Sequence, residues 1–496
     1  MKNPRLIAAC AAALLAAAVA ACSSSPAAES VDNSMVPAPV QPAAQPAAPS
    51  PQPARMTPAT PASRPGTRPV ARGAGRGPAA PAPTKVLDQP AASIANIPVN
   101  YTEADVGTYT LPDPLTLNNG KKVTDANTWL NKRRPQIIAM LEEDQYGKTP
   151  PRPPHLSWDI SDKGTPAFDG KAIRKQITIH LTRNENAHNI ELLEYLPANA
   201  KKRVPLLLCI NFTANNLTVP NDPGVKVGQI WDARAKEYKP ATTGFPFGGE
   251  PIADLIDAGY GVAMFNYADV EPDALDSLSG GIRATYLKPG QTKPAPDQWG
   301  AISAWAWGMS RAIDYLDTDK SVDAKRIAIY GVSRLGKTVT WEGARDPRVA
   351  LVIASCGGEG GAALSRRNYG ETIAHLVAPS RYPYQFAENY AKWAKDPNTN
   401  PVDGHMLVAC IAPRPILLQT GSSDNWSDPK GEFESAVAAG PVYKLLGKDP
   451  LDTDQFPDAN QPILHDIGYF MHAGGHGTMP SDWPIFIKFM DMHLKS

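Results

Sequence analysis

Short, uninterrupted runs of apolar residues recur along the chain after residue 170, separated by amphipathic stretches. A continuous apolar run predicts a strand that is buried on both faces of a sheet, whereas strict alternation predicts a strand with one solvated face. Two segments, 172–181 and 190–195, come first and have the pattern of an antiparallel pair. The continuous runs that follow are 204–212, 259–266, 326–330, 349–355 and 414–419.

Helical patterns lie between these predicted strands. The clearest is 299–316, in which apolar residues recur every three or four positions and so line one face of a helix. Strands that alternate with helices form a mostly parallel sheet with helices on both faces. We therefore predict a three-layer α/β sandwich over residues 96–496, a length that one large domain with insertions can reach.

The first 95 residues have a different composition and predict no folded core. Residues 1–21 combine a positive start with a short run rich in alanine, which predicts a signal segment and not a membrane-spanning helix. This segment resembles the signal of bacterial lipoproteins, in which the next residue, here Cys22, carries the lipid. Ordinary secretory cleavage near Ala21 is the alternative. Residues 22–95 are rich in proline, alanine and serine and predict a disordered tether.

The same features predict where the protein is located and which partners it has. The resemblance to lipoproteins implies, through Ser23, transport to the outer membrane, so we expect a protein of the outer membrane, cell surface or periplasm of a Gram-negative bacterium. The formal net charge is zero and no basic stripe is visible, which argues against nucleic acid. We expect membrane contact only through the lipid, a monomer, and no cofactor. Outside the signal and Cys22 there are three cysteines, too few for a disulfide-built fold: Cys209, Cys356 and Cys410.

One serine stands at the junction of a predicted strand and a predicted helix. Strand 326–330 is followed by Gly331, Val332 and Ser333, and a helical pattern begins at Leu335. A serine at such a turn projects its hydroxyl above the sheet, where N–H groups at the start of the helix face the same point. An acyl-transfer nucleophile requires this position, although Leu335 replaces the glycine that is usual two residues after the serine.

A serine hydroxyl becomes nucleophilic only when a base removes its proton, and in this kind of fold the base follows the serine in the chain. His476 lies in a glycine-rich loop between a strand-like segment, 468–471, and the final predicted helix, 483–494. That loop is the expected place for the base. His472, four residues earlier, suggests a zinc-binding pair as an alternative, but the intervening glycines argue against the helix that such a pair needs.

Three carboxylates are candidates for the group that orients the histidine. Asp424 ends a Gly-x-x-Asp turn after strand 414–419, which is the customary place for this acid. Asp428 is the alternative, although it also has the position of a cap for a helix that begins after it. Glu359, in a glycine-rich turn after the preceding strand, is the third. The order serine, acid, histidine and the order of the predicted elements are those of an α/β-hydrolase.

With these residues placed, the sequence resembles the bacterial glucuronoyl esterases of carbohydrate esterase family 15. The distinguishing motif is Gly331-x-Ser-Arg-x-Gly-Lys337, since ordinary lipases and esterases lack its arginine and lysine. The family cleaves the ester between a 4-O-methyl-glucuronic acid group of xylan and an alcohol of lignin. Further similar segments spread over most of residues 125–496, namely 299–319, 360–367, 403–415, 426–433 and 468–483.

The resemblance implies a role for each residue that matches the motif. It makes Ser333 the nucleophile and His476 the base. It makes the guanidinium of Arg334, with a backbone N–H, part of the oxyanion hole, and a cation there would stabilise the charge of a tetrahedral intermediate. It also implies that Lys337 and Trp426 contact the glucuronoyl ring.

Two departures from the fungal members change the expected site. Their acid is a glutamate 23 residues after the serine, where this chain has Cys356, so the resemblance moves the role to Asp424 or Asp428. They also have a cysteine before the serine that helps to hold the histidine loop by a disulfide. Val332 stands there, so we expect packing to hold that loop. Two other functions stay open: an exported esterase for acetyl or feruloyl groups, and an inactive hydrolase fold that binds glycans.

Overall fold

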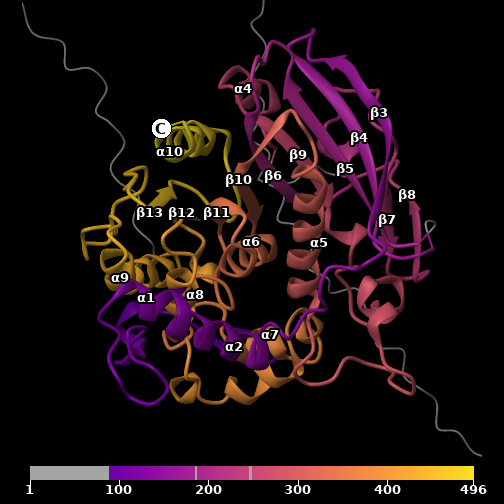
Figure 1. Ribbon diagram of the computed structural model, residues 1–496. Coiled ribbons are helices and arrows are strands. Elements are labelled where there is room, and N and C mark those ends of the chain that lie inside the picture. The colour runs from indigo at the N-terminus through magenta and orange to yellow at the C-terminus, as the bar shows by residue number, and fades with distance from the viewer. Residues whose placement is uncertain (1–88, 185–186, 245–248, 496) are drawn as a thin grey trace, which may run out of the picture. The chain divides into compact units, whose positions relative to one another are not determined.

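A twisted central sheet organises the protein (Figure 1). The computed structural model describes residues 89–184, 187–244 and 249–495, and within these ranges nine strands form this sheet. In spatial order they are β13 (Ile467–His472), β12 (Ile416–Gly421), β11 (Val349–Ser355), β10 (Val322–Val332), β6 (Val204–Asn211), β9 (Gly261–Asn266), β5 (Asn189–Pro197), β4 (Ala172–His180) and β3 (Ser157–Ala167).

The direction of the strands agrees with the prediction of a mostly parallel sheet. Strands β13, β12, β11, β10, β6 and β9 are parallel to one another, and the pairings of β9 with β5, β5 with β4 and β4 with β3 are antiparallel. After β6 the chain moves toward one edge of the sheet, to β9, and after β10 it moves toward the other, to β11. In α/β sheets, ligands bind beyond the carboxyl ends of the strands where connections diverge in this way. We therefore expect a ligand site beyond the carboxyl ends of β6 and β10.

Helices cover both faces of the sheet, so the predicted three-layer α/β fold is confirmed. Alternate residues of each central strand enter two different apolar clusters. On β10, for example, Ile327 and Ile329 belong to the first cluster, and Ala328 and Tyr330 belong to the second. The first is closed by α5 (Ala301–Leu316), α6 (Arg334–Arg345), α8 (Gly404–Ala409) and α9 (Pro429–Leu445). The second is closed by α4 (Ile252–Asp257) and α10 (Trp483–Leu494).

The edge strand β3 was not predicted, because it contains no continuous apolar run and most of its residues are exposed or half-buried.

The remaining elements lie outside the central sheet. None of the helices in the described part of the chain is long and apolar enough to cross a membrane. The other helices and strands are α1 (Ala126–Thr128), α2 (Arg134–Asp144), α3 (Asn215–Thr218), α7 (Ile373–Val377), β1 (Gln89–Ile94), β2 (Ile97–Tyr101), β7 (Gln229–Asp232) and β8 (Glu237–Pro240).

The first strand in the described part of the chain lies within the segment predicted as a tether. The predicted tether extends to residue 95, but β1 pairs with β2 in a hairpin whose two-residue turn is Ala95–Asn96. Both turn residues have positive φ, 52° and 60°, as the tight turn of a twisted hairpin requires. The proline-based prediction missed this pairing because it needs backbone hydrogen bonds and almost no apolar side chains. The predicted signal segment, Cys22 and the tether up to residue 88 lie outside the described residues.

Helix α6 approaches β11 closely because its first turn contains a glycine. A Cβ on Gly336 would lie 2.5 Å from the carbonyl oxygen of Ser355 and 3.3 Å from Cα of Gly357. A side chain at this position therefore has to move either the helix or the end of β11.

We expect Gly336→Ala to lower the melting temperature clearly, because forcing a methyl group into packed backbone typically costs about 1–3 kcal/mol. Gly357→Ala is the matched control, since a Cβ there meets no atom closer than 3.7 Å. Thermal unfolding of the two variants, followed by circular dichroism, checks this. Equal melting temperatures would contradict the close packing of α6.

Candidate active site

Ser333 lies in a strained turn between β10 and α6. Its backbone has φ 60° and ψ −127°, a combination that residues other than glycine rarely adopt. Its N–H donates to the carbonyl oxygen of Ser355 at 2.8 Å, so the turn is tied to the neighbouring strand β11. Helix α6 begins at the next residue and no side chain caps it, which leaves its first N–H groups without a side-chain acceptor.

Two glycines make the turn possible. A Cβ on Gly331 would lie 2.5 Å from the carbonyl oxygen of Leu335, and Gly336 allows the contact with Ser355 described above. Leu335 itself is completely buried. In turns of this kind, a glycine two residues after the serine usually allows the backbone to approach closely. Here Gly336, one position later, allows this approach.

His476 forms a hydrogen-bonded pair with Asp424. Its Nδ1 lies 2.7 Å from Oδ2 of Asp424 and 3.2 Å from the hydroxyl of Ser427. The histidine side chain is 36% exposed and the aspartate side chain only 4%. Burial by itself would raise the pKa of Asp424, but the charge and hydrogen bond of His476, together with Ser427, hold it below its ordinary value. A buried, ionised carboxylate on Nδ1 leaves Nε2 of the imidazole as the atom that can take up a proton.

The structure gives the other two carboxylates different partners. Asp428 caps α9 through the N–H of Gly431, at 3.0 Å, and binds Nε of Arg367 at 2.9 Å. Glu359 accepts hydrogen bonds from the hydroxyls of Ser365 (2.6 Å) and Tyr390 (2.9 Å), and burial raises its pKa to about 8. Of the three candidates, Asp424 is therefore the one with a hydrogen bond to His476.

The histidine loop is held by hydrogen bonds as well as by packing, so the expectation of packing alone was incomplete. The N–H of Gly477 donates to Sγ of Cys356 at 3.3 Å, and the next residue, Thr478, accepts from the hydroxyl of Tyr330 at 2.8 Å. Since Cys356 follows Ser355, the partner of Ser333, these contacts bring the serine turn and the histidine loop to the same edge of the sheet.

His472 contributes to the same support and is not paired with His476. Its Nδ1 lies 2.8 Å from Asp482, and its Nε2 lies 2.9 Å from the carbonyl oxygen of Gly475. Burial tends to lower the pKa of His472, but Asp482 raises it above its ordinary value. The predicted alternative of a zinc-binding histidine pair is not what these contacts form.

Among the described residues, one group of three side chains has metal-ligand atoms within 4.8 Å of one another, and it consists of Cys356, Asp424 and His476. Two of these already bind each other, and the thiol of Cys356 lies 3.5 Å from the carbonyl oxygen of Gly477 as well as accepting its N–H. Burial raises the pKa of this thiol well above its usual range, which disfavours the thiolate that a metal would need. The hydrogen bonds of the group suit proton transfer.

Arg334 follows the serine and is held by an aspartate from another loop. Its guanidinium forms an ion pair with Asp273 and lies over the ring of Tyr382 at 4.8 Å. Asp273 also accepts from the hydroxyl of Tyr384 and the amide of Gln385, each at 2.7 Å. Burial would lower the pKa of Arg334, but the charge of Asp273 raises it, so the guanidinium stays charged. A fixed positive charge therefore lies beside the candidate nucleophile.

Lys337 lies one turn along α6 and is buried. Its ammonium group donates to the carbonyl oxygen of Gly357 at 2.8 Å and lies 3.6 Å from Oε2 of Glu371. Oε1 of Glu371 accepts from Arg381 at 2.9 Å, and the guanidinium of Arg381 lies 5.2 Å from the ring centre of Trp426, which is half-buried. Lys337 and Trp426, predicted separately, are thus joined through Glu371 and Arg381.

A buried carboxyl group also supports the turn after β11. Oε1 of Glu432, on α9, accepts the N–H of Gly358 at 2.7 Å, next to the glycine whose carbonyl oxygen binds Lys337. Burial raises the pKa of Glu432 to about 8. This turn is therefore fixed from α6 and from α9.

Sequence reasoning missed Asp273 and Glu371. Asp273 follows β9 by a few residues, and a carboxylate shortly after a parallel strand at this edge of the sheet is a signal that could have found it. Glu371 lies in a segment without periodicity, between a tight turn and α7, and only its contacts with Lys337 and Arg381 bring it to the site. Nothing in its local sequence indicates a role.

Comparisons with known proteins identify relatives of this chain. A family model described as glucuronyl esterase, fungi, matches residues 256–447. The carbohydrate esterase MZ0003, from an unknown prokaryotic organism, is 41% identical over 402 residues, which are 80% of this chain and 92% of that protein. The 4-O-methyl-glucuronoyl methylesterase 1 of Wolfiporia cocos is 28% identical over 344 residues, 68% of this chain and 72% of that enzyme. The solved glucuronoyl esterase from Solibacter usitatus has a TM-score of 0.75 and 42% identity, covering 79% of this chain and 100% of that one.

We expect Asp424→Asn to lower kcat far more than Glu359→Gln or Asp428→Asn, by up to roughly 10⁴-fold. An asparagine keeps the shape but no longer favours the tautomer in which Nε2 is free to accept a proton. Ester hydrolysis by the three variants, with melting temperatures measured in parallel, checks the assignment. A larger loss of kcat in Asp428→Asn or Glu359→Gln, at unchanged stability, would move the role to that residue.

Proposed function

Because the chain belongs to carbohydrate esterase family 15, the glucuronoyl esterases, we propose that it is a serine esterase that cleaves esters between 4-O-methyl-glucuronoyl groups of xylan and alcohols of lignin. The observation that supports this most directly is the strained serine turn with a charged arginine beside it and a His–Asp pair at the same edge of the sheet. An acetyl group offers no ring hydroxyls to Lys337, so this lysine favours a sugar-derived acyl group over an acetyl ester.

In this proposal the reaction proceeds in two halves. Oγ of Ser333 attacks the carbonyl carbon of the ester while Nε2 of His476 takes its proton, and Asp424 stabilises the imidazolium that forms. The tetrahedral intermediate then collapses, and the alcohol leaves with the proton from His476. A water molecule, deprotonated by His476, attacks the acyl-serine and releases the uronic acid, and the hydroxyl of Ser333 recovers its proton.

Two groups stabilise the negative charge of the intermediate in this proposal. The first N–H groups of α6 face the serine hydroxyl, and the guanidinium of Arg334 lies in the same turn, fixed by Asp273 before the substrate arrives. A donor that is already oriented needs no reorganisation during the reaction, and one such donor is typically worth about 3–4 kcal/mol of transition-state stabilisation.

The uronate itself is recognised by Lys337, Glu371 and Trp426. Ammonium and carboxylate groups can donate to and accept from ring hydroxyls, and the face of an indole ring packs against the C–H groups of a sugar. Trp426 adjoins the loop of Asp424, and Lys337 shares a helix with Arg334. The ring would therefore lie between the catalytic pair and α6, with its carboxyl carbon next to Ser333.

We further propose that the protein is an exported lipoprotein that carries its lipid on Cys22. The sequence features that support this are the short alanine-rich segment before Cys22 and the proline-rich stretch after it, which would act as a tether. Such an arrangement would hold the esterase near a cell surface, where fragments of plant polysaccharide arrive.

We expect the wild-type protein to hydrolyse benzyl glucuronate with a kcat/KM well above that for an aryl acetate. Ser333→Ala should remove both activities, because no other hydroxyl occupies the strained turn. Initial rates on the two esters check this, with the melting temperature of Ser333→Ala as control. A wild-type preference for the acetate would contradict the proposed substrate, and full activity of Ser333→Ala would contradict the nucleophile.

Arg334 and Lys337 should respond differently to the same two substrates. If the guanidinium stabilises the oxyanion, Arg334→Ala lowers kcat on both esters by roughly 10²–10³-fold. If the ammonium binds the sugar ring, Lys337→Met raises KM for the glucuronate and leaves the aryl acetate nearly unchanged. An equal effect of Lys337→Met on both esters would instead mean that its bond to Gly357 only supports the fold.

A further inference from the structure

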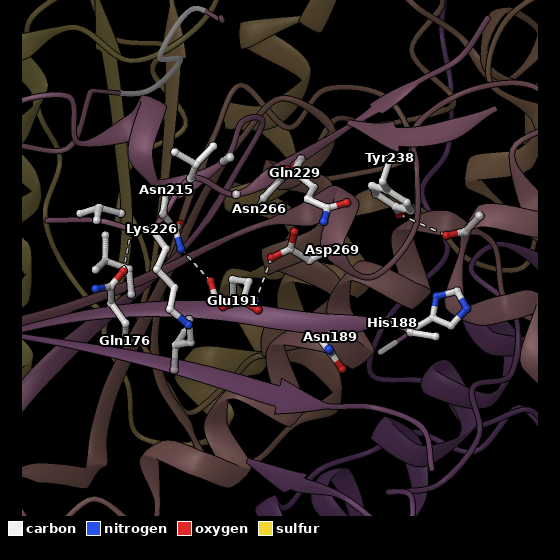
Figure 2. Close-up of a pocket in the computed structure, with 18 of the residues that line it drawn as sticks. Gln176, His188, Asn189, Glu191, Asn215, Lys226, Gln229, Tyr238, Asn266 and Asp269 are labelled. Carbon is white, nitrogen blue, oxygen red and sulfur yellow. Dashed lines mark hydrogen bonds between the residues drawn. The ribbon is translucent and has the colours of Figure 1, made fainter. Parts of the chain in front are cut away.

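A cavity of about 440 Å³ lies at the loop that follows β9 (Figure 2). It is built by the hairpin of β4 and β5, by the start of α3, and by the segment that leads into β7. Ser333, His476 and Asp424 are not among the residues that line it. Its size falls in the range of about 300–1,000 Å³ that is typical of pockets for small organic ligands. The mechanism above gives this cavity no role.

Hydrogen-bonding groups and apolar surface both contribute to the lining of the cavity. Amide side chains surround one space in Figure 2, and one amine and two carboxyl groups join them. Apolar side chains complete the wall, and Tyr238 is its one aromatic residue among those described. The hydroxyl of Tyr238 is already used, because it donates to the carbonyl oxygen of Ala268 at 2.6 Å. The labelled amides are Gln176, Asn189, Asn215, Gln229 and Asn266.

One buried acceptor in this lining has no partner. Asn215 is 7% exposed, and its Nδ2 donates to the carbonyl oxygen of Glu191 at 2.6 Å. Its Oδ1 has no hydrogen-bond partner among the described residues. A buried acceptor without a donor is costly, so the position is suited to a ligand that brings a hydroxyl or N–H group.

Asp269 adds a group that can both donate and accept. One of its carboxyl oxygens accepts the N–H of Glu191 at 3.1 Å, and the carboxyl group faces the cavity (Figure 2). Burial raises the pKa of Asp269 well above its usual range, which favours the protonated carboxyl group, able to donate as well as accept. Burial likewise lowers the pKa of His188, which keeps this imidazole neutral. Lys226 and Glu191 are then the remaining charged residues of the lining, and their charges are opposite in sign.

The cavity is connected to the catalytic residues through one loop. Asp269 and Gly280 both line the cavity, and Asp273, which lies between them in sequence, binds Arg334. The hydroxyl of Tyr238 reaches the same loop at the carbonyl oxygen of Gly280, at 3.1 Å. A molecule in the cavity would therefore lie next to the loop that fixes the arginine of the oxyanion site.

We propose that this cavity is an accessory subsite for neutral sugar residues, the xylosyl units of the polysaccharide that carries the ester. The proposal rests on the proposed function. A neutral polyol matches the lining because its hydroxyls can donate to Oδ1 of Asn215 and exchange hydrogen bonds with Asp269 and Gln229, while its C–H groups pack on the apolar wall. An aromatic lignin ring fits less well, since it would leave Oδ1 of Asn215 without a donor.

Binding of xylotetraose to the full-length Ser333→Ala protein tests the subsite directly, without hydrolysis. We expect Asn215→Leu and Lys226→Met each to weaken binding by about three- to tenfold, the range that corresponds to one or two hydrogen bonds. Lys239→Met is the matched control, because Lys239 lies on the adjoining hairpin, pairs with Asp232 and does not line the cavity. Lys226 is exposed, so its variant stays informative if Asn215→Leu fails to fold.

Kinetics separate this proposal from the proposed function. With the serine restored, both cavity variants should raise KM for a glucuronate ester carried on a xylo-oligosaccharide by the same factor and leave KM for benzyl glucuronate within about twofold. Equal binding of xylotetraose by wild-type and variant cavities would overturn the subsite. Binding of benzyl alcohol that is lost in the variants, with no binding of xylotetraose, would overturn it in favour of an aromatic ligand. If neither ester is hydrolysed while xylotetraose binding still depends on Asn215, the subsite stands and the proposed function fails.

Discussion

The strained backbone at Ser333 is the constraint on which the rest of the site depends. A positive φ at a residue with a Cβ is unfavourable, so it persists only where neighbouring contacts hold it. Here they are the bond from its N–H to Ser355 and the close approaches of Gly331 and Gly336. The β10–β11 pairing and the position of α6 both hold this turn in place. In return, the turn places one hydroxyl, one helix terminus and one guanidinium at the carboxyl edge of the sheet.

The loops that complete the site are matched to this turn by backbone contacts as much as by side chains. A Cβ on Gly421, at the end of β12, would collide with the carbonyl oxygen of Gly475 in the histidine loop, so the acid loop and the base loop meet backbone to backbone. The thiol of Cys356 receives the N–H of Gly477. The carboxylate that binds His476 comes from Asp424, one strand further along the sheet.

The sequence predicted the architecture well because apolar runs report burial, and burial decides which segments form the centre of a sheet. It also indicated Ser333 and His476, since each lies where a strand ends and a loop or helix begins. It left Asp424 and Asp428 as alternatives because only side-chain direction separates them. Glu371 and the cavity around Asn215 depend on contacts between segments far apart in the chain, and such contacts leave no local pattern.

The buried carboxyl groups of Glu359 and Glu432, at the turn after β11, make the stability of the protein depend on pH. Glu359 and Glu432 have pKa values of about 8 in the folded protein, chiefly because of burial, against an ordinary value of 4.5. Below pH 4.5 both the folded and the unfolded chain hold these protons, and the contribution of the two residues to the free energy of unfolding is complete. As the pH rises toward 8, the unfolded chain releases protons that the folded chain keeps, so this contribution declines. Mildly alkaline surroundings thus loosen the turn after β11, whose Gly357 carbonyl oxygen binds Lys337.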